Sequence, residues 1–161
     1  MRIESDSSGL ESIPLKLMIV AVIAALSVVP AANALENLED RDFLRRAEAQ
    51  LDRIVAAAEI LGVQGPGSLR VLDLDFTGDG SLRFLELVLG DALGGPRASS
   101  VILTLSTGAK VVRQANDPPV EMSAGGDECL IIRSEVSRIR MECVLETAHW
   151  YVCLGVHERT S

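Results

Sequence analysis

The chain has 161 residues, which is enough for one domain of ordinary size and a short segment in front of it. Its formal net charge of −8 disfavours nucleic acid or an anionic membrane surface as a partner, because both would repel an acidic protein. Aromatic residues make up only 3% of the chain, so a platform on which bases or sugars stack is not expected.

An apolar segment occupies residues 13–34, behind a polar leader at residues 1–12. As a helix rising about 1.5 Å per residue, this segment would be long enough for a hydrocarbon layer of about 30 Å. Three interpretations stay open. The helix is kept and packs against copies of itself, or it is an export signal cut after Ala32-Asn33-Ala34, or it is a plain single-span anchor.

The leader ends in small residues, and an acidic residue stands at the start of the expected helix. Ser7, Ser8 and Gly9 are the small residues, and Glu11 is the acid. With the unbroken apolar helix behind them, they resemble the N-terminus of archaeal type IV pilins and archaellins. The resemblance implies that a peptidase removes the leader at a site between residues 6 and 9, and that the apolar helix becomes the core of a filament. It also implies that Glu11 pairs with the free amine of a neighbouring subunit.

On this interpretation, assembly depends on Glu11 and on apolar side chains of the same helix. These are Leu17, Ile19, Val22, Ile23 and Leu26.

Residues 35–62 are expected to form an amphipathic continuation of the helix. Apolar residues recur there at spacings of three and four and form one seam, at Leu44, Ala47, Leu51, Ile54, Ala58 and Leu61. Asp40 or Asp42 is a candidate cap at its start, and a linker rich in glycine and proline at residues 63–67 ends it. The simpler interpretation is that the seam covers one face of the C-terminal domain. The other is that helices of several subunits bundle through it.

From residue 68 the apolar period changes to two, which is typical of strands. Alternating apolar positions occur at Leu72, Leu74 and Phe76, at Leu85, Leu87 and Leu89, and at Val101, Leu103 and Leu105. Residues 68–161 are therefore predicted to form an antiparallel β-sandwich or barrel of about six or seven strands. The predicted fold class is α+β, with a long apolar N-terminal helix that continues into an amphipathic helix and is followed by this β-domain.

Residues 75–86 fit the calcium-loop template at most of its positions. Asp75, Asp79, Ser81 and Glu86 match the ligands, and Thr77 stands where the template has Asp or Asn. The template needs a helix on each side, whereas the sequence predicts strands there. We therefore expect a β-hairpin turned by residues 78–80, with a weak calcium site as the alternative and no other metal or cofactor.

Three cysteines, Cys129, Cys143 and Cys153, lie in the last third of the chain, and their spacing matches neither a zinc site nor a redox motif. If residues 134–137 and 147–149 turn two successive hairpins, the three cysteines lie side by side on adjacent strands. One disulfide is then one interpretation, because export favours oxidation. Three small buried apolar side chains are the other.

The sequence contains none of the common nucleophile, metalloprotease or phosphate-binding motifs, so we predict no catalytic residues and no enzyme. We predict a pilin-like structural subunit of the cell surface that assembles through its N-terminal helix. Its expected partners are copies of itself, related subunits and a membrane, and its expected location is a membrane anchor with the C-terminal domain outside the cell, or an extracellular filament. The alternative is an exported or membrane-tethered β-domain that binds its ligand as a monomer.

Overall fold

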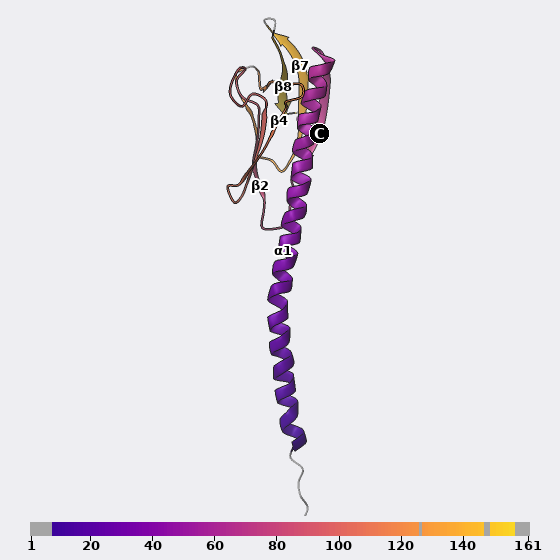
Figure 1. Ribbon diagram of the computed structural model, residues 1–161, viewed down its shortest axis with the longest axis vertical. Helices are drawn as coiled ribbons and strands as arrows, with labels where there is room; N and C mark the ends of the chain where they lie inside the picture. Colours follow the sequence, from indigo (N-terminus) through magenta and orange to yellow (C-terminus); the bar gives the residue numbers. More distant parts are fainter. Residues whose placement is uncertain (1–7, 126, 147–148, 157–161) are drawn as a thin grey trace, which may run out of the picture. The chain divides into compact units, whose positions relative to one another are not determined.

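A computed structural model of the protein describes residues 8–125, 127–146 and 149–156, except for the side chains of residues 8–15 and 25–33. The chain divides into two compact units, Met1–Leu38 and Glu39–Ser161. Its elements are shown in Figure 1 and follow in chain order: α1 (Ser8–Gln64), β1 (Leu69–Asp75), β2 (Phe84–Leu89), β3 (Ser100–Leu105), β4 (Lys110–Gln114), β5 (Met122–Ser123), β6 (Leu130–Ile132), β7 (Val136–Glu146) and β8 (His149–Val156).

The second unit, Glu39–Ser161, contains two four-stranded sheets, which we call sheet A, with the order β1-β7-β8-β5, and sheet B, with the order β4-β3-β2-β6. Neighbouring strands are antiparallel, except that β5 and β8 are parallel. Successive described strands lie in different sheets at four steps, from β1 to β2, from β4 to β5, from β5 to β6 and from β6 to β7. The chain therefore crosses between the two sheets at each of these steps.

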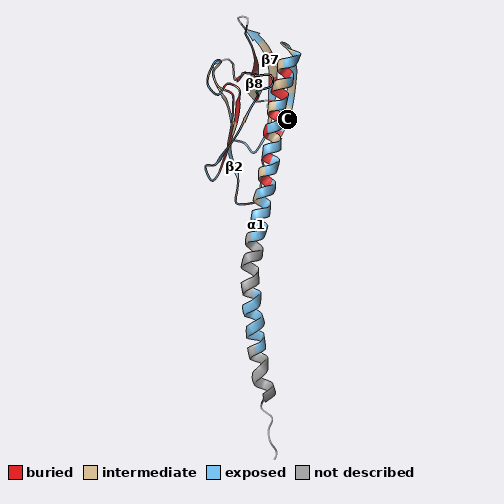
Figure 2. Ribbon diagram, in the orientation of Figure 1, coloured by how far each residue is buried: buried red, intermediate tan, exposed pale blue. Residues whose placement is uncertain are grey.

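The C-terminal part of α1 contributes directly to the core of this unit. Leu51, Ile54 and Leu61 are fully buried, in one cluster with apolar side chains from both sheets. Figure 2 shows the buried residues of α1 in red along this part of the helix. The predicted seam is confirmed, and so is the simpler interpretation that it covers the β-domain. At its start, Phe43 is buried and Leu44 only partly so.

The alternation predicted for β1 is confirmed at Leu74 and Phe76, which are buried, while Leu72 is partly buried. In β3 the predicted positions Val101, Leu103 and Leu105 are buried, but Ser100 and Thr104 are buried as well, so this strand does not alternate. The alternation predicted for β2 is wrong at Leu85, whose side chain is 54% exposed. A register shift between Phe84 and Glu86 turns Phe84 inward instead. Its ring stacks on that of Phe76, with 5.0 Å between the ring centroids.

The predicted fold class needs correction in two respects. Among the described residues, no helix combines the length and the apolar character that a membrane crossing requires. A crossing takes about 20 consecutive apolar residues. In place of the expected transmembrane helix and its continuation, the structure has the helix α1, Ser8–Gln64.

The second correction concerns the strands, of which the described residues form eight rather than about six or seven. The shortest of them, the two-residue strand β5, pairs in parallel with β8. The cap predicted at Asp40 or Asp42 is also wrong, because both residues lie inside α1.

Truncation of the seam tests its place in the core. Ile54 has no exposed surface, so Ile54→Ala is expected to lower the free energy of unfolding by about 2–5 kcal/mol, because it removes buried apolar atoms and leaves a cavity. The matched control is Ile60→Ala on the same helix, where the side chain is exposed and the expected loss is under about 1 kcal/mol. Urea titration followed by circular dichroism measures both variants, and equal losses would contradict the packing described.

Candidate functional site

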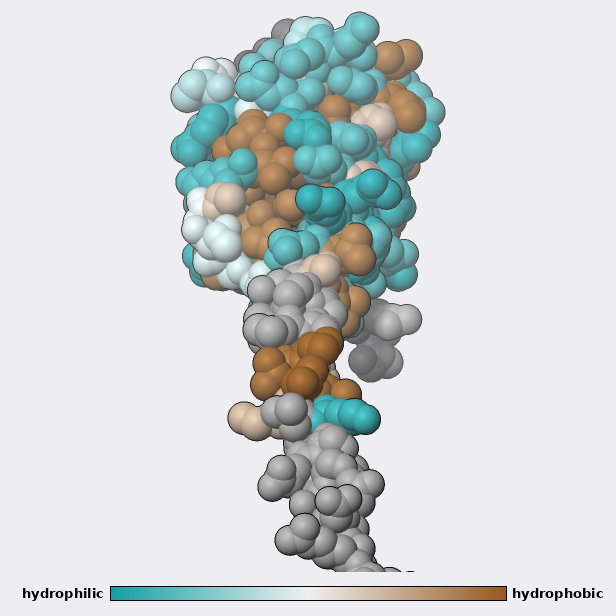
Figure 3. Space-filling model, turned by 60° about the horizontal axis from the view of Figure 1, so that its bottom comes forward, coloured by the Kyte–Doolittle hydropathy of each residue, from teal (hydrophilic) through white to brown (hydrophobic). Residues whose placement is uncertain are grey.

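A run of exposed apolar side chains marks the described part of the first unit, Met1–Leu38. Leu17, Met18, Ile19, Val20, Val22 and Ile23 are each between 50% and 66% exposed. We call residues 17–23 the apolar run, and Figure 3 shows it as a brown band between grey segments. Met18, Ile19, Val22 and Ile23 line a shallow hollow of about 230 Å³ on it.

Four of the residues predicted to act in assembly, Leu17, Ile19, Val22 and Ile23, therefore lie together and are open to solvent. The side chains of Glu11 and Leu26, the other two, lie outside the described residues.

The predicted calcium loop is arranged differently from a calcium site. The Oδ1 of Asp75 accepts hydrogen bonds from the backbone N–H and the hydroxyl of Thr77, at 2.9 and 2.6 Å. The hydroxyl of Ser81 donates to Asp40, and Glu86 lies in β2 with its carboxylate 3.8 Å from Arg133. Within the ranges that the structure describes, no three acidic, histidine or cysteine side chains are grouped so that they could hold a metal ion.

The expected hairpin is wrong as well, because β1 and β2 belong to different sheets and residues 76–83 cross between them. Asp40 of α1 holds this crossover. Its Oδ2 accepts the hydroxyl of Ser81 at 2.6 Å, and its Oδ1 accepts the backbone N–H of Leu82 at 2.9 Å. A Cβ at Gly80 would lie 2.5 Å from the Oδ1 of Asp40, so only glycine allows this approach without a shift.

Hydrogen bonds shift the acidity of both carboxyl groups in this region. The hydroxyl of Ser81, and then the N–H of Leu82, hold the pKa of Asp40 below its ordinary value of 3.8. The hydroxyl and N–H of Thr77 lower the pKa of Asp75 in the same way. Donors that favour the charged form explain both shifts, and the same hydrogen bonds hold the geometry of the loop.

The predicted placement of the cysteines is wrong. Cys129 precedes β6, which pairs with β2 and not with β7. Cys143 lies opposite Val152, and Cys153 lies opposite Glu142. Since neighbouring residues of a strand face opposite sides of a sheet, Cys143 and Cys153 point to different faces.

All three cysteines are free thiols in this structure. Cys143 is buried, and burial raises the pKa of its thiol. A raised pKa disfavours the thiolate, which is the reactive form. Cys143 therefore fits the interpretation of a small apolar core residue.

A second hollow, of about 490 Å³, brings the one described histidine next to acidic side chains. The Nε2 of His149 lies 3.2 Å from the Oε2 of Glu121, and the same oxygen accepts the backbone N–H of Gly94 at 3.1 Å. None of the described residues that line this hollow carries a hydroxyl or thiol nucleophile. The arrangement ties the start of β8 to the loop before β3.

Comparison with known proteins adds no relative: no family model, no curated protein and no solved structure matches the chain. The resemblance to archaeal type IV pilins therefore stays a prediction, as do the expected lack of catalytic residues and of a cofactor.

The crossover held by Asp40 was not found from the sequence. The only signal for it is the pair of glycines, Gly78 and Gly80, that lie against α1 residues.

Removal of the Asp40 carboxylate should destabilise the protein in a pH-dependent way. Because the native pKa of Asp40 is lowered, its contribution is complete above the ordinary value of 3.8 and is lost as the pH falls through the native value. Asp40→Ala should therefore lower the free energy of unfolding at pH 7. The difference in this free energy between the variant and the unchanged protein should become smaller below pH 3.8.

The control is Asp42→Ala, which removes only an exposed pair with Arg46 on the same helix. Denaturant titrations at pH 7, 5 and 3 measure all three proteins. Equal effects of the two substitutions, or a difference that widens in acid, would contradict the role given to Asp40.

Proposed function

We propose that this protein is a pilin-like structural subunit of an extracellular filament, which assembles with copies of itself or related subunits through the apolar run. The observation that carries the proposal is the exposure of six large apolar side chains at residues 17–23. Contiguous exposed apolar surface of this kind marks a surface that another molecule covers.

The distribution of these side chains around the helix favours a bundle over a simple pair. Residues 17–24 are all apolar, and eight consecutive positions cover every side of a helix. A helix that is apolar all round is normally buried on all sides. Several neighbouring copies are needed to cover it, as in the core of a filament.

Burial of the apolar run supplies a driving force of the same order as the cost of assembly. Full burial of one large apolar side chain contributes about 1.5–3 kcal/mol. The six side chains are between 50% and 66% exposed, so covering them contributes about half of six such amounts, or about 5–9 kcal/mol per copy. The loss of free movement on association costs about 4–15 kcal/mol.

The second unit, Glu39–Ser161, supports the same proposal in a different way. It has its own buried core, and most of the acidic residues of the chain lie in it. Like charges on its surface disfavour aggregation of these units with one another. Association would then be confined to the apolar run.

A substitution in the apolar run tests the proposal. Val20→Asp should abolish filaments, or assemblies larger than a few copies, because it places a charge in the shared apolar core. The control is Val63→Asp near the other end of α1, where the valine is 75% exposed and outside the run. Electron microscopy and analytical ultracentrifugation of the full chain measure assembly, and filaments of the Val20→Asp protein would contradict the proposal.

Mass spectrometry of the mature protein separates this function from the monomeric alternative. A first residue between 7 and 10 fits the pilin-like subunit, because the apolar run is retained. A first residue at Leu35 would remove the run and overturn the proposal, leaving a β-domain that acts without it.

A further inference from the structure

A pocket of about 730 Å³ opens in the second unit, where the ends of β1, β7 and β8 meet β6 and the residues after it. Its apolar lining consists of Leu74, Ile131, Ile132, Val136 and Val156. The volume lies within the range of about 300–1,000 Å³ that is typical of small-molecule sites. An apolar lining with a few polar groups is typical of such sites as well.

One polar group that lines the pocket has no hydrogen-bond partner among the described residues. Ser137 lies opposite Leu74 in the pairing of β1 with β7, so both side chains are on the same face of the sheet. Leu74 is buried in the core, and the Oγ of Ser137 is buried without a hydrogen bond to any described residue. A buried hydroxyl that makes no hydrogen bond destabilises the folded protein. A sequence selected only for packing would have an apolar residue there.

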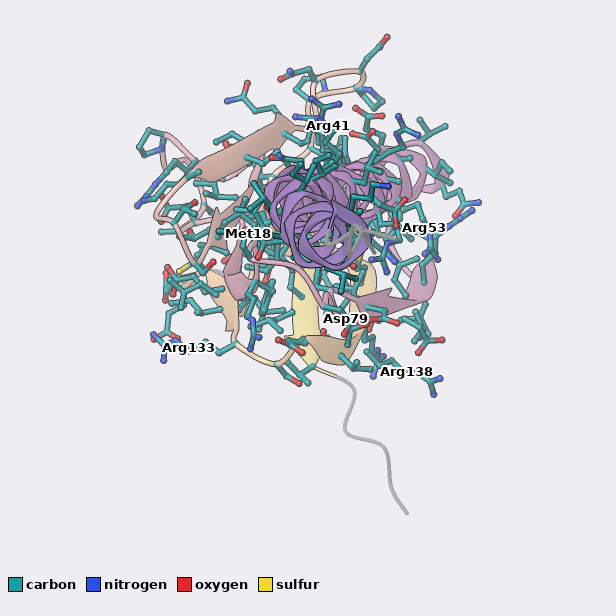
Figure 4. All side chains as sticks on the ribbon, turned by 90° about the horizontal axis from the view of Figure 1, so that it is seen from below. Met18, Arg41, Arg53, Asp79, Arg133 and Arg138 are labelled. Atoms are coloured by element: carbon teal, nitrogen blue, oxygen red, sulfur yellow. The ribbon has the colours of Figure 1, made fainter. Side chains whose placement is uncertain are left out.

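The charges at the rim differ in how far they are already neutralised. The Nε of Arg138 donates to Asp73 at 2.5 Å, and Asp75 is hydrogen-bonded to Thr77. Arg133 is 3.8 Å from Glu86, and its side chain is 75% exposed. Figure 4 shows Arg133 and Arg138 on different sides of the ribbon, with both side chains pointing outward. Arg133 is therefore the rim cation with most capacity to bind an added anion.

We propose that this pocket binds an amphipathic carboxylate. The apolar chain of the ligand lies between the ends of the two sheets, against Leu74, Ile132 and Val156. Its carboxylate accepts hydrogen bonds from the guanidinium of Arg133 and from the hydroxyl of Ser137. The binding supplies the partner that Ser137 lacks, and it uses no residue of the apolar run.

Decanoate is the probe for this site, with decanol as its uncharged counterpart. Isothermal titration of the full chain carrying Val20→Asp should show decanoate binding, and this background separates the pocket from assembly. Arg133→Gln should weaken decanoate about tenfold or more and leave decanol unchanged, because it removes a charge-assisted hydrogen bond. Arg97→Gln is the matched control, since Arg97 is another exposed arginine that does not line the pocket.

Ser137→Ala gives a second readout that does not depend on the arginine. It should weaken decanoate and raise the melting temperature of the free protein, because the unpartnered hydroxyl is gone. Absence of decanoate binding would overturn the proposal. So would equal losses in the two arginine variants, or a Ser137→Ala protein that binds decanoate as before. Failure of these binding tests would not contradict filament assembly, so the two proposals are tested independently.

Discussion

Burial of one face of α1 against both sheets is the constraint on which the structure of the second unit depends. The helix is attached to the β-domain at three levels. At the first level, Asp40 accepts hydrogen bonds from residues 81 and 82 of the crossover. In the middle, Asp52 accepts a hydrogen bond from the Nε of Arg113 in β4 at 3.0 Å. Near its end, Glu59 accepts the backbone N–H groups of Asn116 and Asp117. Between these levels, Leu51 and Ile54 complete an apolar core that the sheets share.

The same helix therefore carries two kinds of apolar surface, one buried within the protein and one exposed. The seam at residues 43–61 has one apolar face, and the protein itself buries it. The run at residues 17–23 is apolar in consecutive positions and exposed. An intramolecular core accounts for the first surface, whereas the second is the surface on which the proposed assembly rests. This difference is the physical basis for proposing a subunit that folds by one part of α1 and assembles by another.

The features that the sequence predicted well are those that depend on local period. The spacing of Leu51, Ile54 and Leu61 identified the buried face of the helix, and alternation identified buried positions of β1 and β3. Hydropathy left residues 13–34 open between a self-packing helix, a cleaved export signal and a membrane anchor, because an apolar stretch of this length fits all three. The described residues contain no helix that could cross a membrane.

The features that the sequence missed depend on contacts between distant residues. A bulge at Phe84 reverses which side chain of β2 faces inward, and a shift of one position separates Cys143 from Cys153. Asp40 contacts residues more than 40 positions away in the chain. The unpartnered hydroxyl of Ser137 is also invisible in a sequence, since it depends on the pairing of β7 with β1. Pairing register is set by the whole sheet, so no local pattern could reveal the features of β2 and β7. For the contacts of Asp40, the two glycines at positions 78 and 80 were the only local signal.

Native-state hydrogen exchange tests the central claim, that the seam of α1 is part of the same core as the sheets. If it is, the amides of residues 47–61 open only with global unfolding, and their exchange free energies equal those of β3 and β7. If instead these helix amides exchange at a clearly lower free energy while β3 and β7 stay protected, the helix is a detachable cover and the account is contradicted.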